Sequence, residues 1–387
     1  MVTHVRTLIA SLVLVACSDP ASSPSLDIAD TALPDTALVD TANGSLDADS
    51  STPDTTPDLA DTPQPDAPDL DIALTDIPPS DTSPPAADTS VSDPLAACRI
   101  ADRPLTFARQ LPYAEVRIGS NTGLFLVDWG TTGSAIDPRH FTPSAPAPNN
   151  GTTNRWEGFD FFGLWSTVTL SPQDFSAFND PVAQAGILGT DFLSSDAYLI
   201  DWPAARLSRI DCTPDQLRAA GFVAVSTAGY FTDDPSTLPP NTPNIPTIPI
   251  RLGTPTTFPA QIDTGFDDSL RGPAVNINRA LYDQLPPNAI IRTPSADLTL
   301  TTCVPGVTEP VLAHRLVAPL TLVATDGTTA VDVPDVYVFL KDTPAAASSC
   351  GGIGTWSTPA AQLGVAVIAS AGRVVFDPTT SRVWLQL

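Results

Sequence analysis

The sequence has few basic residues, few histidines and no long apolar run. Its 387 residues include 18 Lys and Arg against 43 Asp and Glu, which gives a formal net charge of −25. A chain with this charge repels phosphate polyanions, so nucleic acid is not expected as a partner. Three histidines leave little room for a His-rich metal site. No apolar run reaches the roughly 18 residues of a membrane-spanning helix. The length allows one large domain or two ordinary ones.

The first residues have the pattern of a secretory signal. Arg6 precedes a short apolar stretch, residues 8–16, and Cys17 follows. Residues 14–17 read Leu-Val-Ala-Cys and resemble the lipobox of bacterial lipoproteins. The resemblance implies that the signal, residues 1–17, carries lipid on Cys17, and that Ser18 after it favours the outer membrane or cell surface. The alternative is an ordinary secretory signal with an incidental cysteine.

Residues 18–97 differ in composition from the rest of the chain. They are built largely of Asp, Thr, Pro, Ser and Ala, and contain no Lys, Arg, Phe, Tyr or Trp. Such a segment cannot bury enough apolar surface to offset the entropy lost on ordering. We therefore expect a disordered, extended linker between the lipid anchor and a folded domain.

Aromatic residues, Gly and alternating apolar residues recur from about Cys98 onward. They form short β-rich runs, for example at 113–118, 124–127, 336–340 and 373–376. Short runs of this kind, separated by Gly and Pro, predict an all-β architecture.

Two short helices are expected within this part. Residues 213–216 read Thr-Pro-Asp-Gln, which is a capping box with Pro at the first helical position. Gly221 would end that helix. Residues 278–285 are the second candidate.

A degenerate internal duplication is the most informative feature of the sequence. An Asp-x-Gly triplet occurs at Asp128 and again at Asp263, each time after a strand, a Gly-containing turn and a second strand. Each triplet is followed by a Leu-Gly pair, at 188–189 and at 363–364, and then by an Asp-x4-Arg segment in matching register. This duplication predicts two related lobes.

The expected lobes are residues 98–245, which include an interlobe connector, and residues 246–387. Their motifs resemble those of the pepsin-like and retropepsin-like aspartic peptidases. The resemblance rests on Phe-Leu-Val-Asp-Trp-Gly-Thr-Thr-Gly-Ser at 125–134, on Gly-Ile-Leu-Gly-Thr-Asp-Phe-Leu at 186–193 and on Ile-Asp-Thr-Gly at 262–265. It implies a bilobal fold of two β-barrel-like lobes with the active site in a cleft between them.

The resemblance implies that Asp128 and Asp263 are catalytic. Hydrolysis of an amide without a metal or a covalent intermediate needs an activated water and an acid for the leaving group. Two carboxyl groups about 3 Å apart supply both, because they cannot both ionise and therefore share one proton. No cofactor and no metal is expected for this chemistry.

The neighbouring residues take their expected roles from the same resemblance. Support for the pair is expected from Gly130, Thr131, Thr264 and Gly265. Thr131 could donate a hydrogen bond to the Asp128 carboxylate, and the two glycines would permit the tight turn at each aspartate. A strand is expected to pass close beneath each carboxyl group at Leu188, Gly189, Leu363 and Gly364.

The sequence departs from the family pattern at three places. Trp129 replaces a hydroxyl residue that would bond across to the other lobe, and Phe266 replaces a second one. Asp267 and Asp268 follow the second aspartate, and we expect them to be surface groups of a loop; pointing inward, they would raise the pKa of the pair.

The flap over the cleft is expected in the hairpin 149–165. It contains no tyrosine, so Trp156 and Trp165 are the candidates for the flap side chain, and a plain core role is the alternative for both.

Cysteine usage agrees with an exported protein. Without Cys17, four cysteines remain, which predicts two disulfides with three alternative connectivities. A bridge between Cys98 and Cys212 would join the two ends of the first lobe. A bridge between Cys303 and Cys350 would resemble one found in the second lobe of pepsins.

The sequence therefore predicts a surface-anchored aspartic endopeptidase, a hydrolase that works best at acidic pH. Its expected partners are a peptide or protein substrate and a membrane reached through the lipid anchor, and it is expected to be monomeric. The alternatives are a catalytically impaired relative that binds extended peptides and a surface display module. Turnover separates the first from the other two.

Overall fold

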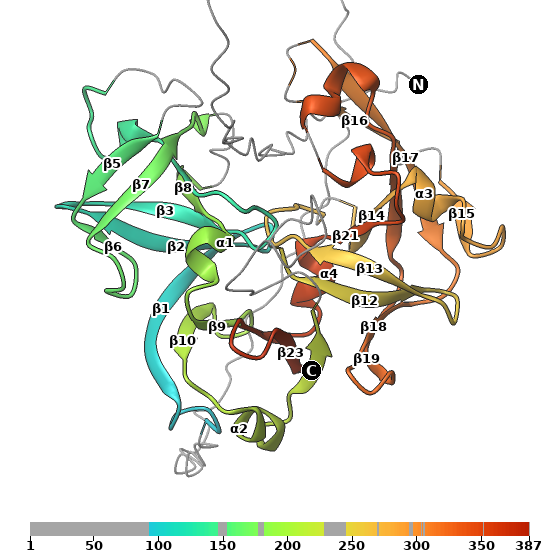
Figure 1. The fold of residues 1–387 in the computed structure, drawn as a ribbon, viewed down its shortest axis with the longest axis horizontal. Coiled ribbons are helices and arrows are strands. Elements are labelled where there is room, and N and C mark those ends of the chain that lie inside the picture. Colours follow the sequence, from blue (N-terminus) through green and yellow to red (C-terminus); the bar gives the residue numbers. More distant parts are fainter. Residues whose placement is uncertain are drawn as a thin grey trace, which may run out of the picture. The chain divides into compact units, whose positions relative to one another are not determined.

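The computed structural model describes residues 93–145, 153–176, 182–227, 245–268, 271–293, 297–302, 304, 306–350 and 352–386. The expected signal and lipid-bearing Cys17, together with nearly all of the expected linker, lie outside these ranges. The described chain is mostly β, with two mixed sheets and few short helices (Figure 1). None of its helices is long and apolar enough to cross a membrane. The expectation of a β architecture is confirmed at this level.

The larger sheet of the described chain has thirteen strands, and all but two of them come from the expected first lobe, residues 98–245, which is called the first half below. These strands are β1 (Arg99–Ala108), β2 (Leu111–Ile118), β3 (Asn121–Val127), β4 (Ala135–Ile136), β5 (Asn154–Glu157), β6 (Phe159–Asp160), β7 (Thr167–Pro172), β8 (Gln184–Leu188), β9 (Ala197–Asp201), β10 (Arg206–Ile210), β11 (Val223–Ser226), β22 (Arg373–Asp377) and β23 (Arg382–Gln386). Their order in the sheet is β11-β23-β22-β9-β10-β1-β2-β3-β8-β4-β7-β5, and β6 pairs with β2.

The second sheet has ten strands, all from the expected second lobe, residues 246–387, which is called the second half below. These are β12 (Thr247–Leu252), β13 (Thr257–Ile262), β14 (Ala274–Asn278), β15 (Ile290–Arg292), β16 (Leu298–Thr301), β17 (Thr308–Leu316), β18 (Leu320–Val323), β19 (Thr329–Val333), β20 (Tyr337–Lys341) and β21 (Ala361–Leu363). Their order is β15-β17-β20-β14-β21-β13-β12-β18-β19, and β16 pairs with β17.

The pattern of apolar residues matches the position of each strand. β12 alternates buried and half-buried residues, as expected of a strand with one face on the core. In contrast, every residue of β8 and of β14 is buried. Both of these strands have a parallel neighbour, β3 for β8 and β20 for β14, and continuous apolar runs are typical of strands covered on both faces.

Within the described ranges, four short α-helices connect the strands: α1 (Thr190–Leu193), α2 (Pro214–Ala219), α3 (Arg279–Tyr282) and α4 (Val365–Ala369). Three 3₁₀ segments accompany them: η1 (Pro138–His140), η5 (Ala345–Cys350) and η6 (Ile353–Thr355). The expected capping box of α2 is confirmed, and Gly221 follows the helix with φ of 87°. The second expected helix is shorter than residues 278–285, because Pro286 and Pro287 follow so closely.

The duplicated motifs occupy equivalent places in the two halves. β8 lies parallel to β3, beside the first Asp-x-Gly triplet, and β21 lies parallel to β13, beside the second. A short helix follows each of these strands, α1 after β8 and α4 after β21, and each helix leads into a hairpin. Both hairpins, β9–β10 and β22–β23, pair Asp with Arg across the turn.

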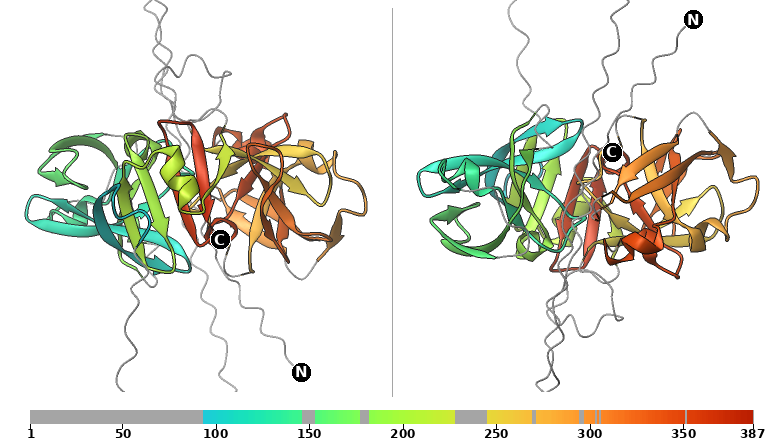
Figure 2. Two further views of the ribbon diagram at one scale, coloured as in Figure 1. Left: turned by 90° about the horizontal axis from the view of Figure 1, so that it is seen from below. Right: turned by 90° about the horizontal axis from the view of Figure 1, so that it is seen from above.

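The final two strands cross the boundary expected between residues 245 and 246. β22 pairs with β9 through Val374 and Ile200, and β23 pairs with β11. Figure 2 shows these last strands, in red, beside the green strands of the first half. The two halves therefore share one sheet, and residues 92–387 belong to one compact unit.

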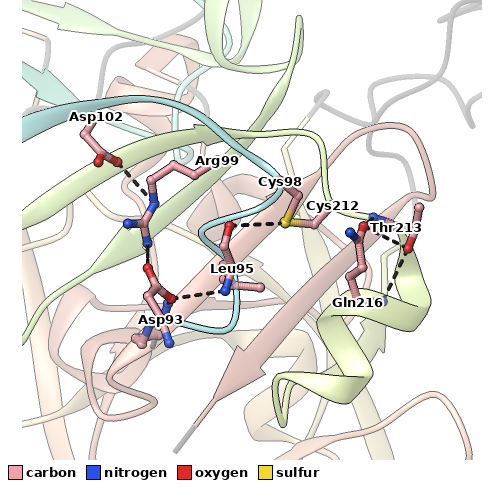
Figure 3. Close-up of a disulfide and its surroundings, with 9 residues drawn as sticks. Asp93, Leu95, Cys98, Arg99, Asp102, Cys212, Thr213 and Gln216 are labelled. Atoms are coloured by element: carbon pink, nitrogen blue, oxygen red, sulfur yellow. Dashed lines mark hydrogen bonds and ion pairs between the residues drawn. A yellow bond between two sulfur atoms is a disulfide. The ribbon is translucent and has the colours of Figure 1, made fainter. Parts of the chain in front are cut away.

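One disulfide is present in the described chain, between Cys98 and Cys212 (Figure 3). It joins the start of β1 to the residue before the cap of α2, with the Cα atoms 4.9 Å apart. The expected pairing of Cys98 with Cys212 is therefore confirmed. The expected partner of Cys350, Cys303, lies outside the described residues.

Candidate catalytic site

Two buried carboxyl groups meet where the equivalent strands of the two halves end. Asp128 follows β3 and is 7% exposed, and Asp263 follows β13 and is 9% exposed. The backbone N–H of Asp128 donates to the Leu188 carbonyl at 2.9 Å, and that of Asp263 donates to the Leu363 carbonyl at 3.1 Å. The two Leu-Gly segments thus hold the two aspartates by the same backbone contact.

The two carboxyl groups share a hydrogen-bond donor. The Gly265 N–H donates to Oδ1 of Asp263 at 2.9 Å and to Oδ1 of Asp128 at 3.2 Å. The Gly130 N–H donates to Oδ1 of Asp128 at 2.7 Å. A side chain at Gly130 would collide with the Asp263 carboxyl group, and one at Gly265 would collide with that of Asp128. Glycine is therefore required at both positions for the carboxyl groups to meet.

Burial disfavours ionisation of both groups. Desolvation raises the pKa of Asp128 to about 6, against hydrogen bonds from Gly130, Asp263 and Gly265 that lower it. Desolvation also raises the pKa of Asp263 well above its usual value, and the charge of Asp128 adds to that effect. The interaction between the two side chains lowers the pKa of Asp128 and raises that of Asp263, as expected when Asp263 holds the proton that the two groups share. The arrangement therefore stabilises a singly protonated pair.

Thr264 ties the second half to the first. Its hydroxyl group donates to the Val127 carbonyl at 2.8 Å and accepts from the Trp129 N–H at 3.0 Å. The Thr264 side chain is fully buried. A single hydroxyl group thus satisfies two backbone groups that flank Asp128 in the other half.

Trp129 fills the position where the resemblance would place the second hydroxyl residue. Its ring is fully buried and stacks on Phe376 of β22, with centroids 3.8 Å apart and planes 9° from parallel. Tyr198 of β9 packs against its edge at 6.4 Å. The indole Nε1 has no hydrogen-bond partner among the described residues. Aromatic packing onto the shared sheet thus replaces a polar contact between the halves.

The expected hydrogen bond from the Thr131 hydroxyl group to the Asp128 carboxylate is not formed between these described residues. The Thr131 hydroxyl group instead donates to the Gly133 carbonyl at 3.3 Å and accepts from the Gly133 N–H at 3.4 Å. These bonds close a local turn. Phe266, at the equivalent place in the second half, is buried in an apolar cluster with residues such as Val311 and Phe339.

The glycines of the Leu-Gly pairs permit close passage of the chain. A Cβ atom at Gly189 would lie 3.0 Å from backbone atoms of Thr131 and Gly133, tighter than ordinary contact. At Gly364 a Cβ atom would collide with the Asp268 carboxyl group. Leu188 and Leu363, the residues before these glycines, are fully buried.

The expectation that Asp267 and Asp268 face solvent is wrong for Asp268. That side chain is 3% exposed and accepts hydrogen bonds from the N–H groups of Ala274 at 2.8 Å and of Ala366 at 2.7 Å. Desolvation raises the pKa of Asp268 to about 7. Asp267 pairs with Arg109 of the β1–β2 turn at 3.1 Å.

The two flap candidates lie on the hydrophobic core. Trp156 in β5 packs edge-on against Phe141 at 6.2 Å, and Trp165 packs against Phe192 at 4.8 Å. Both are partly buried against the main core cluster. β5 pairs with β7, so the hairpin runs beyond Trp165, and the expected start of the hairpin lies outside the described residues.

Two polar residues near the site were not anticipated from the sequence. Gln362 of β21 donates from Nε2 to Oδ2 of Asp263 at 2.6 Å. Lys341 of β20 is 2% exposed and forms an ion pair with Glu309 of β17 at 3.5 Å. Burial lowers the pKa of Lys341, and the charges of Glu309 and Asp263 oppose that effect. The sequence did single out Lys341 in one respect, since it is the only lysine among the 387 residues.

No protein-family model matches the chain, and no curated protein matches it. The described residues also contain no group of three or more His, Cys, Asp or Glu side chains placed to hold a metal ion. The likeness to aspartic peptidases therefore rests on the residues of this chain and on their geometry.

Proposed function

We propose that the chain is an aspartic endopeptidase with the bilobal fold of the pepsin-like and retropepsin-like families. The observation that carries the proposal is the meeting of Asp128 and Asp263 from equivalent places in the two halves. One N–H group, that of Gly265, donates to both carboxyl groups. The need for glycine at both 130 and 265 supports the same arrangement.

The proposed reaction uses the pair as acid and base together. The ionised carboxyl group takes a proton from a water molecule, whose oxygen attacks the carbonyl carbon of the substrate amide. The protonated carboxyl group supplies its proton to the substrate, and the C–N bond breaks as the amine nitrogen is protonated. The pair regains its single proton, so the products are a carboxylic acid and an amine. Burial supports this chemistry, because a low dielectric prevents both groups from ionising together.

The proposed working range is closer to neutral pH than the acidic optimum expected from the sequence. Because the pKa of Asp128 is raised to about 6, the pair is doubly protonated well below that pH. The singly protonated form predominates from about pH 6 upward, until Asp263, whose pKa is also raised, ionises as well. Peptide cleavage should therefore rise through about pH 6.

A peptide-binding protein without turnover is the second candidate, and Trp129 is the observation that favours it. Beside the carboxyl pair, Thr264 is the one described residue whose hydroxyl group bridges the halves, whereas Trp129 stacks on Phe376. A carboxyl pair held from one side is less constrained than one held from both, and catalysis is sensitive to small displacements of the reacting groups.

Envelope anchoring is part of the proposal and rests on the first 17 residues alone. Lipid on Cys17 would hold the protein at a bacterial membrane, at the outer membrane or cell surface. Detergent-phase partition of the full-length protein tests this, with Cys17→Ser as the control that should move to the aqueous phase. Recovery of the unaltered protein in the aqueous phase, with Cys17 unmodified, would reject the anchor.

Binding of a transition-state mimic separates the candidate functions. The probe is a pool of peptides in which a secondary alcohol replaces the scissile carbonyl, compared by calorimetry with the pool of parent peptides. A peptidase should bind the alcohol pool at least about 100-fold more tightly than the parents. Equal affinity for both pools would favour the peptide-binding candidate. Binding of neither pool would reject both and leave a display module.

A further inference from the structure

Gln362 makes a direct side-chain contact with the carboxyl pair. Its Nε2 donates to Oδ2 of Asp263 at 2.6 Å, and the residue is 7% exposed. Its Oε1 accepts from Nδ2 of Asn276 in β14 at 2.9 Å, and Asn276 is 2% exposed. The two amides thus form a buried chain that ends on the outer oxygen of Asp263. The inner oxygen, Oδ1, faces Gly130 in the other half.

The equivalent position in the first half is apolar. Asn276 and Gln362 face each other in the antiparallel pair of β14 and β21. In the first half, Ala135 of β4 and Ile187 of β8 face each other in the same way, one residue before the Leu-Gly pair begins. No side-chain amide donates to Asp128 in the described residues. The amide chain therefore distinguishes two carboxyl groups that are otherwise held alike.

Packing alone does not explain the two buried amides. A buried amide costs free energy unless each of its polar atoms is hydrogen-bonded, whereas an apolar pair of similar size has no such requirement. The first half shows that Ala and Ile fill the equivalent place. Gln362 is also oriented, because its carbonyl oxygen is occupied by Asn276 and its N–H group must point toward Asp263.

We propose that Gln362, held by Asn276, is a positioning residue that keeps the shared proton on the inner side of the pair, between Asp263 Oδ1 and Asp128. The N–H group of Gln362, 2.6 Å from Oδ2, disfavours a proton on that oxygen, because a proton on the same lone pair would face the donor. Oδ1 accepts from Gly265 at the longer distance of 2.9 Å and lies toward the first half, so it is the better site for the proton. The same donor stabilises negative charge on Asp263. The role of this contact in peptide hydrolysis rests on the proposed function, but the contact's effect on the proton does not.

The other charged groups near Asp263 are on different elements. Asp128 approaches from the first half, and its negative charge opposes ionisation of Asp263. Lys341 on β20 favours ionisation, although its ion pair with Glu309 of β17 offsets part of that effect. Asp267 in the adjacent loop is paired with Arg109. None of these groups changes when Gln362 is replaced. A shift in the pKa of the carboxyl pair in a Gln362 variant is therefore attributable to loss of the amide.

Infrared spectroscopy of the full-length protein tests the proposal without turnover. The carbonyl band of buried, protonated carboxyl groups is followed against pH, and its contribution from the pair is assigned by its loss in Asp128→Asn and Asp263→Asn. Gln362→Met removes the amide and keeps a side chain of similar length. The apparent pKa of the pair should rise by about one unit or more, which is the effect of losing one hydrogen bond to a charged group.

Two further variants complete the test. Ile187→Met makes a comparable change at the equivalent position of the first half and should leave the titration unchanged. Asn276→Leu releases the Gln362 amide and should shift the titration in the same direction as Gln362→Met, by a smaller amount; it decides the question if Gln362→Met does not fold. An unchanged or lowered pKa in folded variants would overturn the proposal. A raised pKa in a protein that cleaves no peptide would retain it while rejecting the proposed function.

Discussion

At the scale of single residues, one hydroxyl group and one aromatic stack join the halves beside the carboxyl pair, in addition to the Gly265 N–H group that donates to Asp128. The Thr264 hydroxyl group satisfies the Val127 carbonyl and the Trp129 N–H, neither of which can reach water from this buried position. The Trp129 ring lies flat on Phe376. These contacts are of different kinds, so substitutions should affect them differently.

Thr264→Val should destabilise the protein by about 1 to 3 kcal/mol, because the isosteric side chain leaves a buried N–H and a buried carbonyl group without partners. It should also lower kcat/KM, because the backbone beside Asp128 loses its restraint. Thr264→Ser keeps the hydroxyl group and is the matched control. Urea unfolding gives the stability change. A Thr264→Val protein as stable as Thr264→Ser would show that the hydroxyl group does not join the halves.

Trp129→Thr restores the residue type expected at this position from the resemblance, yet it should destabilise the protein by about 3 to 5 kcal/mol. The cause is the cavity left against Phe376 and Tyr198, since threonine fills a small part of the indole volume. Trp129→Phe retains a stacked ring and should lose less. Thermal unfolding measures both, and equal stability of Trp129→Thr and the unaltered protein would contradict the account.

At the scale of elements, the second Asp-x-Gly loop is fixed to its neighbours by a buried carboxyl group. Asp268 accepts from Ala274 at the start of β14 and from Ala366 in the first turn of α4. Acidic groups are favourable at a helix N-terminus, where N–H groups lack partners within the helix. The loop that presents Asp263 is thereby attached to both elements.

The titration of Asp268 should appear in the pH dependence of stability. Its pKa in the folded protein, about 7, lies above the ordinary value of 3.8. A raised pKa means that the carboxyl group contributes stability at low pH, and that this contribution is lost as the pH rises through about 7. Asp268→Asn does not titrate. The unfolding free energy of the unaltered protein, relative to that of Asp268→Asn, should fall by at most about 4 kcal/mol between about pH 4 and about pH 7. A constant difference would show that Asp268 is not buried as a protonated group.

Elements specified by local chemistry were predictable from the sequence, and those that depend on distant partners were not. The α2 helix was predictable because its capping box and its terminating glycine lie within nine residues of one another. The burial of Asp268 was not, because the amide of Ala366 that it binds lies 98 residues away in the chain. The expected hydrogen bond from Thr131 failed for a related reason, since its hydroxyl group closes a turn with Gly133 instead.

At the scale of the whole molecule, the end of the chain completes a sheet of the first half. β22 pairs with β9 and supplies Phe376, the stacking partner of Trp129. Val374, Val375 and Phe376 are fully buried. The two halves should therefore unfold together, because neither has a complete core without this strand.

A chain that ends at Gly372 should lack a cooperative unfolding transition. The truncation removes β22 and β23, exposes the edge of β9 and leaves Trp129 without its partner. The control ends at Gln386 and keeps both strands. Circular dichroism during heating measures the transition, and a truncated chain with the transition of the control would disprove the shared core.

The duplication made the carboxyl pair predictable. The places where the two halves differ could not be predicted by comparing the halves. Asp128 and Asp263 were identified because each is followed by a Leu-Gly pair and an Asp-x4-Arg segment. Gln362 was missed because its counterpart, Ile187, is apolar, so comparison of the halves gave no signal for an amide. The pairing of β22 with β9 was missed because sheet pairing between halves leaves no pattern in either strand.

The most direct test of the central claim is cleavage of an unfolded protein by the purified full-length chain. The rate should be measured from about pH 4 to about pH 8, beside the Asp128→Asn and Asp263→Asn variants. Cleavage should rise through about pH 6. Each variant should lose at least about 1,000-fold in rate, because neither carboxyl group can replace the other. Cleavage that survives in either folded variant, or no cleavage by the folded unaltered protein at any pH, would contradict it.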